Sequence, residues 1–250
     1  MTATTRIGVI LTYDNAIDPE LWRWCPPDVS LHIARTGYPD EDESVRDSNE
    51  QVSDPAQLRF ATRSLIFLEP AVVTFACTSG SFHGGLAWER SIRETMLAAG
   101  AGRAQTTSGA LLEAIDVLGI RRLAVGTPYD RGSTDRLGTF LAEAGITAVS
   151  LEHQPPRPGD DLNDFSEADL EGLAERAMRP DADALFLSCT ALATIDLIPQ
   201  LERRYGVPVL TSTQVTMWAA LRAAGARTAV ADQTLFAAAG GAAGVSTSAG

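Results

Sequence analysis

The chain has 250 residues, 45% of them hydrophobic and 21% charged, which are ordinary proportions for a globular protein. Its formal net charge of −12 argues against nucleic acid or an anionic membrane as a partner, because either would require a basic patch. The sequence contains no lysine, which excludes a Schiff-base lysine and with it the usual attachment of pyridoxal phosphate.

Short apolar runs alternate with longer amphipathic segments along the chain. The apolar runs predict strands at 6–11, 29–34, 71–76, 122–126, 147–152, 184–188 and 207–211. The amphipathic segments predict helices at 54–68, 85–99, 108–118, 132–144, 166–178, 191–205 and 213–224. Strands that are apolar throughout and alternate with helices are typical of parallel sheets covered on both faces, so we predict an α/β fold.

Three segments lack a core-forming pattern. The acidic stretch 38–47 and the proline-rich stretch 152–164 are predicted loops, and residues 237–250 are predicted to form a flexible tail. The N-terminal residues lack a basic segment followed by a long apolar run, and no apolar segment approaches the about 18 residues of a membrane span. We therefore expect a cytoplasmic protein with no membrane partner.

The chain contains an internal repeat. The segments "PAVVTFACTSGS" and "DADALFLSCTAL" share an apolar strand followed by Cys-Thr, which places Cys77 and Cys189 112 positions apart. Two apolar strands lead into Tyr13-Asp14 and Tyr129-Asp130, and the helical segments 106–119 and 212–225 match at a similar spacing. The repeat predicts two pseudo-symmetric lobes, each a mainly parallel sheet flanked by helices. We assign residues 1–105 plus 212–230 to the first lobe and 106–211 to the second.

The paired cysteines are predicted at positions where a thiol can react, unlike an ordinary core cysteine. Ligands of open parallel sheets bind beyond the carboxyl ends of the strands, and Cys77 and Cys189 are each predicted at such an end, directly before a helix. A helix N-terminus offers free N–H groups and a partial positive charge, which we expect to lower the pKa of both thiols. The hydroxyls and glycine of 78–81 would complete an anion cradle. The structural alternative is that each cysteine is a small buried residue, but their matching positions favour function.

Metal or disulfide chemistry is not expected from the cysteines. Cys25, Cys77 and Cys189 are widely spaced, odd in number and without a CxxC pair, which predicts neither a disulfide framework nor a zinc site. Short polar residues at Thr127, Thr211 and Ser212 also follow predicted strands. In that position they either touch a substrate or cap the next helix.

Four motifs together carry a resemblance to a known family. "LTYDN", "ACTSGSFHGG", "GTPYD" and "FLSCTALATIDLIPQLE" resemble the aspartate/glutamate racemase superfamily, and within it the branch of maleate cis–trans isomerases and arylmalonate decarboxylases. The likeness extends to about residue 230. It implies two pseudo-symmetric lobes with the active site in the cleft between them, and a reaction that uses no cofactor and no metal.

The resemblance also implies roles for individual residues. Cys77 resembles the nucleophile that adds to the maleate double bond, and Cys189 resembles the thiol that donates and recovers a proton. The residues that resemble substrate-binding positions, or that follow the second cysteine as Thr78 follows the first, are Asn15, Thr78, Ser79, Tyr129 and Thr190. Two departures are notable: "TSGS" after Cys77 is similar to the decarboxylases, yet those carry glycine where this chain has Cys77.

The leading hypothesis is a cofactor-independent cis–trans isomerase of a small dicarboxylate, of the maleate-to-fumarate type. An amino-acid or hydantoin racemase and an arylmalonate-type decarboxylase are the enzymatic alternatives, because the same thiols support proton transfer in each. A bilobed binding protein without catalysis is the alternative from another class. The expected partner is a small carboxylate substrate. The apolar stripes of the helices near 108–118 and 217–225 are expected to form core or subunit contacts, so a homo-oligomer is possible.

Overall fold

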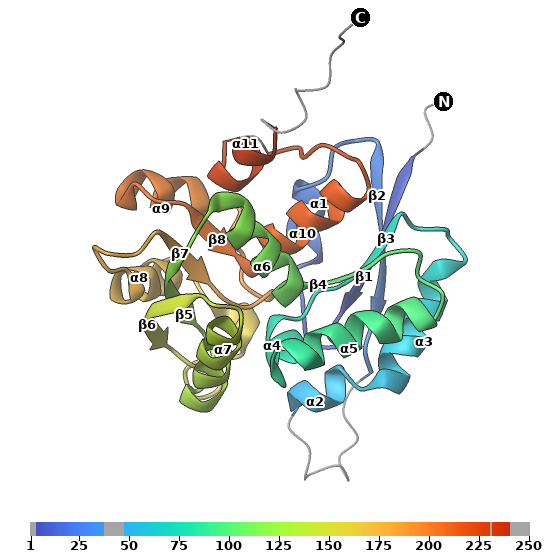
Figure 1. The fold of residues 1–250 in the computed structure, drawn as a ribbon, viewed down its shortest axis with the longest axis horizontal. Helices are drawn as coiled ribbons and strands as arrows, with labels where there is room; N and C mark the ends of the chain where they lie inside the picture. Colours follow the sequence, from blue (N-terminus) through green and yellow to red (C-terminus); the bar gives the residue numbers. More distant parts are fainter. Residues whose placement is uncertain (1–3, 38–47, 231, 241–250) are drawn as a thin grey trace, which may run out of the picture.

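The computed structural model describes residues 4–37, 48–230 and 232–240. It contains two four-stranded parallel sheets with helices on their faces, which appear as two lobes side by side in Figure 1. The strands of the first sheet lie in the order β2 (Val29–Arg35), β1 (Thr5–Leu11), β3 (Val72–Phe75) and β4 (Ala104–Thr106). The strands of the second lie in the order β6 (Thr147–His153), β5 (Arg122–Thr127), β7 (Ala184–Leu187) and β8 (Val209–Thr211). The predicted two-lobed α/β fold is confirmed.

The helices follow the amphipathic segments of the sequence, with several short additions. The first lobe holds α1 (Asp18–Arg23), α2 (Ser48–Val52), α3 (Pro55–Ile66), α4 (Thr78–Phe82) and α5 (Gly85–Ala98). The second holds α7 (Arg131–Glu143), the 3-10 turn η2 (Leu162–Asp164), α8 (Glu167–Ala177) and α9 (Ile198–Tyr205). Two similar helices, α6 (Thr107–Leu118) and α10 (Ser212–Ala223), pack against each other between the lobes, and α11 (Thr234–Gly240) packs on α6.

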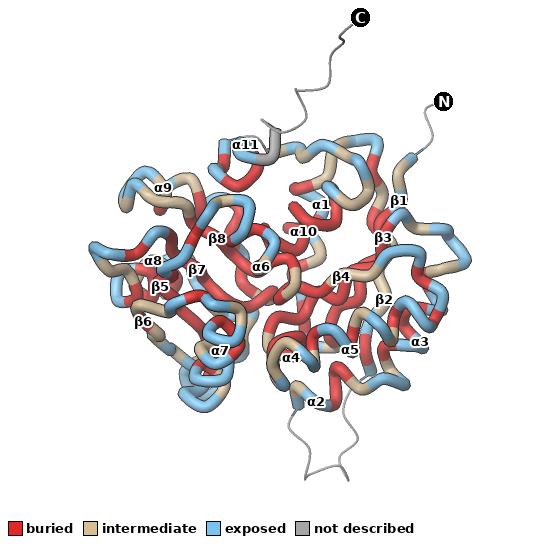
Figure 2. Tube along the Cα trace, viewed as in Figure 1, coloured by how far each residue is buried: buried red, intermediate tan, exposed pale blue. Residues whose placement is uncertain are grey.

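The central strands are the most deeply buried parts of the chain. All four residues of β3 and all four of β7 are buried, because helices cover both faces of each sheet (Figure 2). One cluster of apolar side chains runs from the inner face of the first sheet through α6 and α10 to the second sheet, and another lies between the first sheet and α3 and α5. The lobes therefore share a core, which fixes the strand ends of the first sheet relative to those of the second.

Polar contacts from α1 also join the lobes. The buried carboxylate of Glu20 accepts hydrogen bonds from the Thr194 backbone N–H, 2.8 Å from Oε2, and from the Thr194 hydroxyl, 3.3 Å from Oε1. One turn further, Arg23 makes a bidentate ion pair with Asp196 at 2.6 and 2.7 Å. These bonds hold the segment that follows Cys189 against the first lobe.

The helix predicted over 191–205 is wrong at its start. Helix α9 begins at Ile198, and residues 190–197 form turns and bends. The Thr194 N–H that a longer helix would bond internally is bound by Glu20 instead, and Pro199 sits in the first turn, where its missing N–H costs nothing. The short strand β4 was not predicted, because three residues carry too little periodicity.

The lobe boundaries at 105/106 and 211/212 stay a prediction. The two sheets take their strands from 5–106 and 122–211. Helix α11 carries regular structure through Gly240, so it overlaps the first four residues of the predicted tail, while 241–250 and the predicted loop 38–47 lie outside the described residues. In the part of the chain that the structure covers, no helix is both long and apolar enough to cross a bilayer.

Candidate active site

A cavity of about 460 Å³ opens between the lobes at the carboxyl ends of the four central strands. The stretches 12–15, 77–79, 128–130 and 189–191 that follow β1, β3, β5 and β7 all contribute to its lining. This is where ligands of open parallel sheets bind. The two cysteines and the five residues assigned to substrate binding all line this one cavity: Asn15, Cys77, Thr78, Ser79, Tyr129, Cys189 and Thr190.

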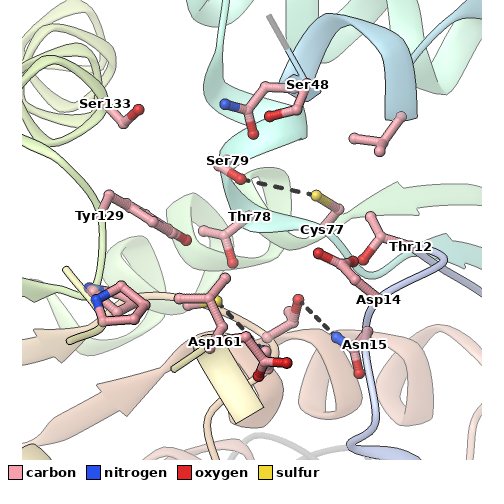
Figure 3. Close-up of a pocket in the computed structure, with 18 of the residues that line it drawn as sticks. Thr12, Asp14, Asn15, Ser48, Cys77, Thr78, Ser79, Tyr129, Ser133 and Asp161 are labelled. Carbon is pink, nitrogen blue, oxygen red and sulfur yellow. Dashed lines mark hydrogen bonds between the residues drawn. The ribbon is translucent and has the colours of Figure 1, made fainter. Parts of the chain in front are cut away.

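Cys77 lies just after the end of β3 and lines the cavity. It is the residue before α4, is 7% exposed, and its Sγ lies 4.0 Å from the Ser79 hydroxyl (Figure 3). A Cβ on Gly80 would lie 3.0 Å from this sulfur and 3.3 Å from a Val52 methyl. Glycine at 80 therefore leaves room for the thiol.

Cys189 is also 7% exposed but has a different backbone setting from Cys77. Its φ is 97°, in the left-handed region that residues with a Cβ rarely adopt. The Ala191 N–H donates to its Sγ at 3.4 Å, and a turn follows where the sequence predicted a helix. The prediction that Cys189 directly precedes a helix is therefore wrong, and only Cys77 has that position.

Tyr129 stands beside the cysteines with its hydroxyl directed toward Thr78 (Figure 3). It is 9% exposed, and its hydroxyl accepts a hydrogen bond from Ser188 at 3.2 Å. Burial raises the pKa of Tyr129 well above its usual value, and the nearby Cys189 thiol raises it further. The phenol is therefore neutral and available as a hydrogen-bond donor in the cavity.

The other predicted binding residues are held by bonds of their own. The Asn15 amide donates to the Thr190 hydroxyl at 3.4 Å, and that hydroxyl donates to the Ala76 carbonyl at 3.0 Å, so Asn15 and Thr190 meet across the lobes. The Thr78 hydroxyl, which the sequence suggested for a substrate carboxylate, donates to Ser212 at 2.8 Å. Ser79 is half-buried, with its hydroxyl in the cavity.

The predicted lowering of the thiol pKa values is wrong. Burial raises the pKa of Cys77 to about 12 and that of Cys189 to about 11. Hydrogen bonds from the Gly80 N–H to Cys77, and from the Ala191 N–H and Tyr129 to Cys189, oppose this effect without overcoming it, and the Asp14 carboxylate adds to it at both sulfurs. Both thiols therefore carry their protons at neutral pH, which suits them to donate a proton.

The alkylation of both thiols by iodoacetamide is expected to rise about tenfold per pH unit from pH 7 to pH 10, without the plateau that a free thiol shows above about pH 8.5. Cys189 should react ahead of Cys77, because its pKa is the lower of the two. Peptide mass spectrometry would follow each site, with circular dichroism to show that the protein stays folded and urea-unfolded protein as the control. A plateau below pH 8 at either cysteine would contradict the raised pKa values.

Part of the cavity wall was missed by sequence reasoning. The proline-rich loop of the second lobe contributes Pro155, Pro156 and 161–163 to the lining. Within it the Asn163 amide donates to the Asp14 carbonyl at 3.0 Å, and its oxygen accepts from the Ala16 N–H at 3.1 Å. The sequence feature that could have indicated this wall is the long loop after a strand of the second lobe, because such loops frequently carry function.

Three polar residues considered for substrate contact lie outside the cavity lining. Thr211 caps α10, and Thr127 bonds the Thr134 hydroxyl at 2.6 Å. Ser212 is fully buried. Within 4–37, 48–230 and 232–240, no group of three or more His, Cys, Asp or Glu side chains is arranged to hold a metal ion. The donors that face the cavity from Ser79, Tyr129 and Asn15 are hydroxyl and amide groups, which suit a carboxylate ligand.

A protein-family model matches most of the described chain. Residues 45–236 match the family model described as arylmalonate decarboxylase. The chain belongs to the arylmalonate decarboxylase family. Membership confirms the resemblance that the paired cysteine motifs indicated, and it places the chain among enzymes.

Relatives in this family include both decarboxylases and isomerases. The chain is 36% identical over 157 residues to the arylmalonate decarboxylase of Bordetella bronchiseptica, an alignment covering 62% of this chain and 65% of that protein. It is 25% identical over 159 residues to the maleate isomerase of Nocardia farcinica, covering 61% and 63%. The aligned segment thus spans a little under two thirds of each relative.

Solved structures of the family have the same fold. A crystal structure of arylmalonate decarboxylase superposes with a TM-score of 0.78 at 30% identity, covering 93% of this chain and 99% of that one. A related structure is of a decarboxylase variant in which a glycine is replaced by cysteine. The Nocardia farcinica maleate cis–trans isomerase, solved with a covalently bound succinylcysteine intermediate, has a TM-score of 0.78 at 21% identity, covers 93% and 98%, and shares the fold.

Proposed function

We propose that this protein is a cofactor-independent decarboxylase of a small malonate-type diacid, and that Cys189 protonates the carbanion left by the departing CO₂. The observation that carries the proposal is that two thiols, whose pKa values burial raises, line one cavity together with several hydroxyl groups at the strand ends. The 36% identity to an arylmalonate decarboxylase supports the same reaction class.

The reaction balances with the groups that face the cavity. One carboxylate leaves as CO₂, and the electron pair of the broken C–C bond passes to the α-carbon and the remaining carboxylate as an enediolate. Hydroxyl donors such as Ser79 and Tyr129 are suited to stabilise the charge that develops on those oxygens. The Cys189 S–H then gives its proton to the α-carbon, and the resulting thiolate regains a proton from water.

The thiol ionisation state favours decarboxylation over the leading sequence hypothesis. Cis–trans isomerisation by addition requires Cys77 as a thiolate, whereas burial raises the pKa of Cys77 to about 12. Proton donation requires the neutral thiol, which is the form that burial stabilises at Cys189. The proposed reaction therefore begins from the protonation state that burial favours.

Cis–trans isomerisation of a maleate-type diacid is the second candidate. The observation that favours it is Cys77 itself, a second thiol on the same cavity as Cys189. In that reaction the Cys77 sulfur would add to one alkene carbon while Cys189 protonates the other. The single bond would rotate, the Cys189 thiolate would take the added proton back, and elimination would release Cys77 as the thiolate that began the reaction. Hydrogen bonds from the cavity hydroxyls to a substrate carboxylate would stabilise the charge that the addition develops on it.

The test is a substrate screen followed by NMR in deuterated water. We expect turnover of arylmalonates with release of CO₂ and one deuterium at the α-carbon of the product, because the donated thiol proton exchanges with solvent. Conversion of maleate alone, giving fumarate, would replace the proposal with the isomerase. Deuterium exchange into the α-carbon of aspartate, glutamate or a hydantoin, without loss of CO₂, would replace it with a racemase.

A further inference from the structure

Ser212 connects the two cysteine-bearing turns from outside the cavity. It is the first residue of α10 and is fully buried. Its Oγ accepts hydrogen bonds from the Thr78 hydroxyl at 2.8 Å and from the Cys189 backbone N–H at 2.9 Å. Because Thr78 directly follows Cys77, one hydroxyl of a central helix links the turn of the first lobe to the turn of the second.

Ser212 accepts its hydrogen bond from Cys189, a residue whose backbone is strained. A non-glycine residue with a φ of 97° persists only where its surroundings hold the backbone, and such strain is concentrated at functional sites. The bond from the Cys189 N–H to Ser212 supplies that restraint on one side, and the bond from the Thr190 hydroxyl to the Ala76 carbonyl supplies it on the other. Without Ser212, a buried N–H would lose its acceptor and the turn would relax.

The hydroxyl of Ser212 is not needed to start α10. The N-cap is Thr211, whose side chain accepts from the Gln214 N–H at 3.3 Å, while the Gln214 amide oxygen accepts from the Thr211 N–H. This capping box satisfies the helix start by itself. The first helical position therefore has no helix-forming reason to carry a hydroxyl, which leaves its bonds to Thr78 and Cys189 as its function.

We propose that Ser212 is a positioning residue that holds the Cys189 thiol at a fixed place relative to the Cys77 turn. Displacement of a reacting group by about 1 Å is enough to cost roughly 10²-fold in rate. The kinetic part of this inference rests on the proposed decarboxylation. The part that concerns the exposure and motion of the Cys189 thiol rests on the hydrogen bonds alone.

The test compares Ser212→Ala with Ser150→Ala. Ser150 is a matched control because it is a buried serine of β6 whose hydroxyl donates to the Ala177 carbonyl, away from both cysteines. For Ser212→Ala we expect kcat on an arylmalonate to fall roughly 10²-fold with KM changed less than about threefold. We also expect iodoacetamide to label Cys189 about fivefold faster relative to Cys77, which is the effect of losing about one hydrogen bond that keeps the turn closed.

The two readouts separate the inference from the proposed function. An unchanged or lower labelling ratio in Ser212→Ala, or an equal rise in Ser150→Ala, would overturn the positioning role. In another outcome, the unmodified protein turns over no arylmalonate while Ser212→Ala still shows the expected rise in Cys189 labelling. That pair of results would overturn the decarboxylation and leave the positioning role standing. If circular dichroism shows Ser212→Ala unfolded, Ser212→Cys takes its place with the same expected results, since it nearly keeps the side-chain size and weakens the acceptor.

Discussion

Replacement of Cys189 by alanine is expected to lower kcat for decarboxylation by about 10³-fold or more, because it removes the proton donor of the reaction. Decarboxylation would still begin in the cavity, but the carbanion would depend on water for its proton. KM should change little, since the hydroxyl and amide donors of the cavity remain. Steady-state kinetics on an arylmalonate measures kcat and KM. The stereochemistry of the deuterated product shows whether water has replaced the thiol as the proton donor.

Two other cysteines provide matched controls for that variant. Cys25→Ala should leave kcat unchanged, because Cys25 lies outside the cavity lining and its thiol donates to the Leu21 carbonyl. Cys77→Ala should retain decarboxylation within about tenfold, as expected of a residue that is not the proton donor. Retention of activity in Cys189→Ala with loss in Cys77→Ala would make Cys77 the proton donor and overturn the role proposed for Cys189.

Replacement of Tyr129 by phenylalanine is expected to lower kcat/KM by about 10²-fold, the usual cost of removing one donor from a pre-organised site. The hydrogen bond from Tyr129 also lowers the pKa of Cys189, so its loss should raise that pKa further and disfavour the thiolate left after proton transfer. The kinetic constants and the pH dependence of Cys189 alkylation should therefore shift together, with slower labelling at any given pH below about 11.

Tyr205→Phe is the matched control for the loss of a phenol. Tyr205 lies at the end of α9, away from the cavity, and its hydroxyl has no hydrogen-bond partner within the described residues. This variant should keep the activity of the unmodified protein. Equal activity of Tyr129→Phe would show that Tyr129 does not stabilise the reacting substrate, and Cys189 labelling at the unmodified rate would show that it does not stabilise the thiolate.

The position of the two cysteines was predictable because it depends on patterns that are local. Cys77 and Cys189 each follow a strand that is apolar throughout, and β3 and β7 are central in their sheets. The carboxyl ends of parallel strands share one edge, so residues after such strands meet there. Tyr129 and Asn15 were indicated by the resemblance to the family; they follow β5 and β1 and line the same cavity.

The parts that were not predictable depend on contacts between residues distant in the sequence. The segment after Cys189 has the apolar spacing of a helix, but Glu20, 174 positions away from Thr194, takes the N–H that would begin it. The loop that carries Asn163 reaches the first lobe through bonds to Asp14 and Ala16. Neither contact leaves a periodic signal in its own segment.

The sequence by itself determined the class of the fold, the doubling of its lobe and the position of the two cysteines at strand ends. Those features follow from apolar periodicity and from residue type at strand ends, both of which act over a few residues. Only the tertiary structure decided the protonation state of the thiols and the strained geometry of Cys189. Burial raises a thiol pKa through the removal of water by both lobes together, and that desolvation outweighs the local donors that had suggested a reactive thiolate.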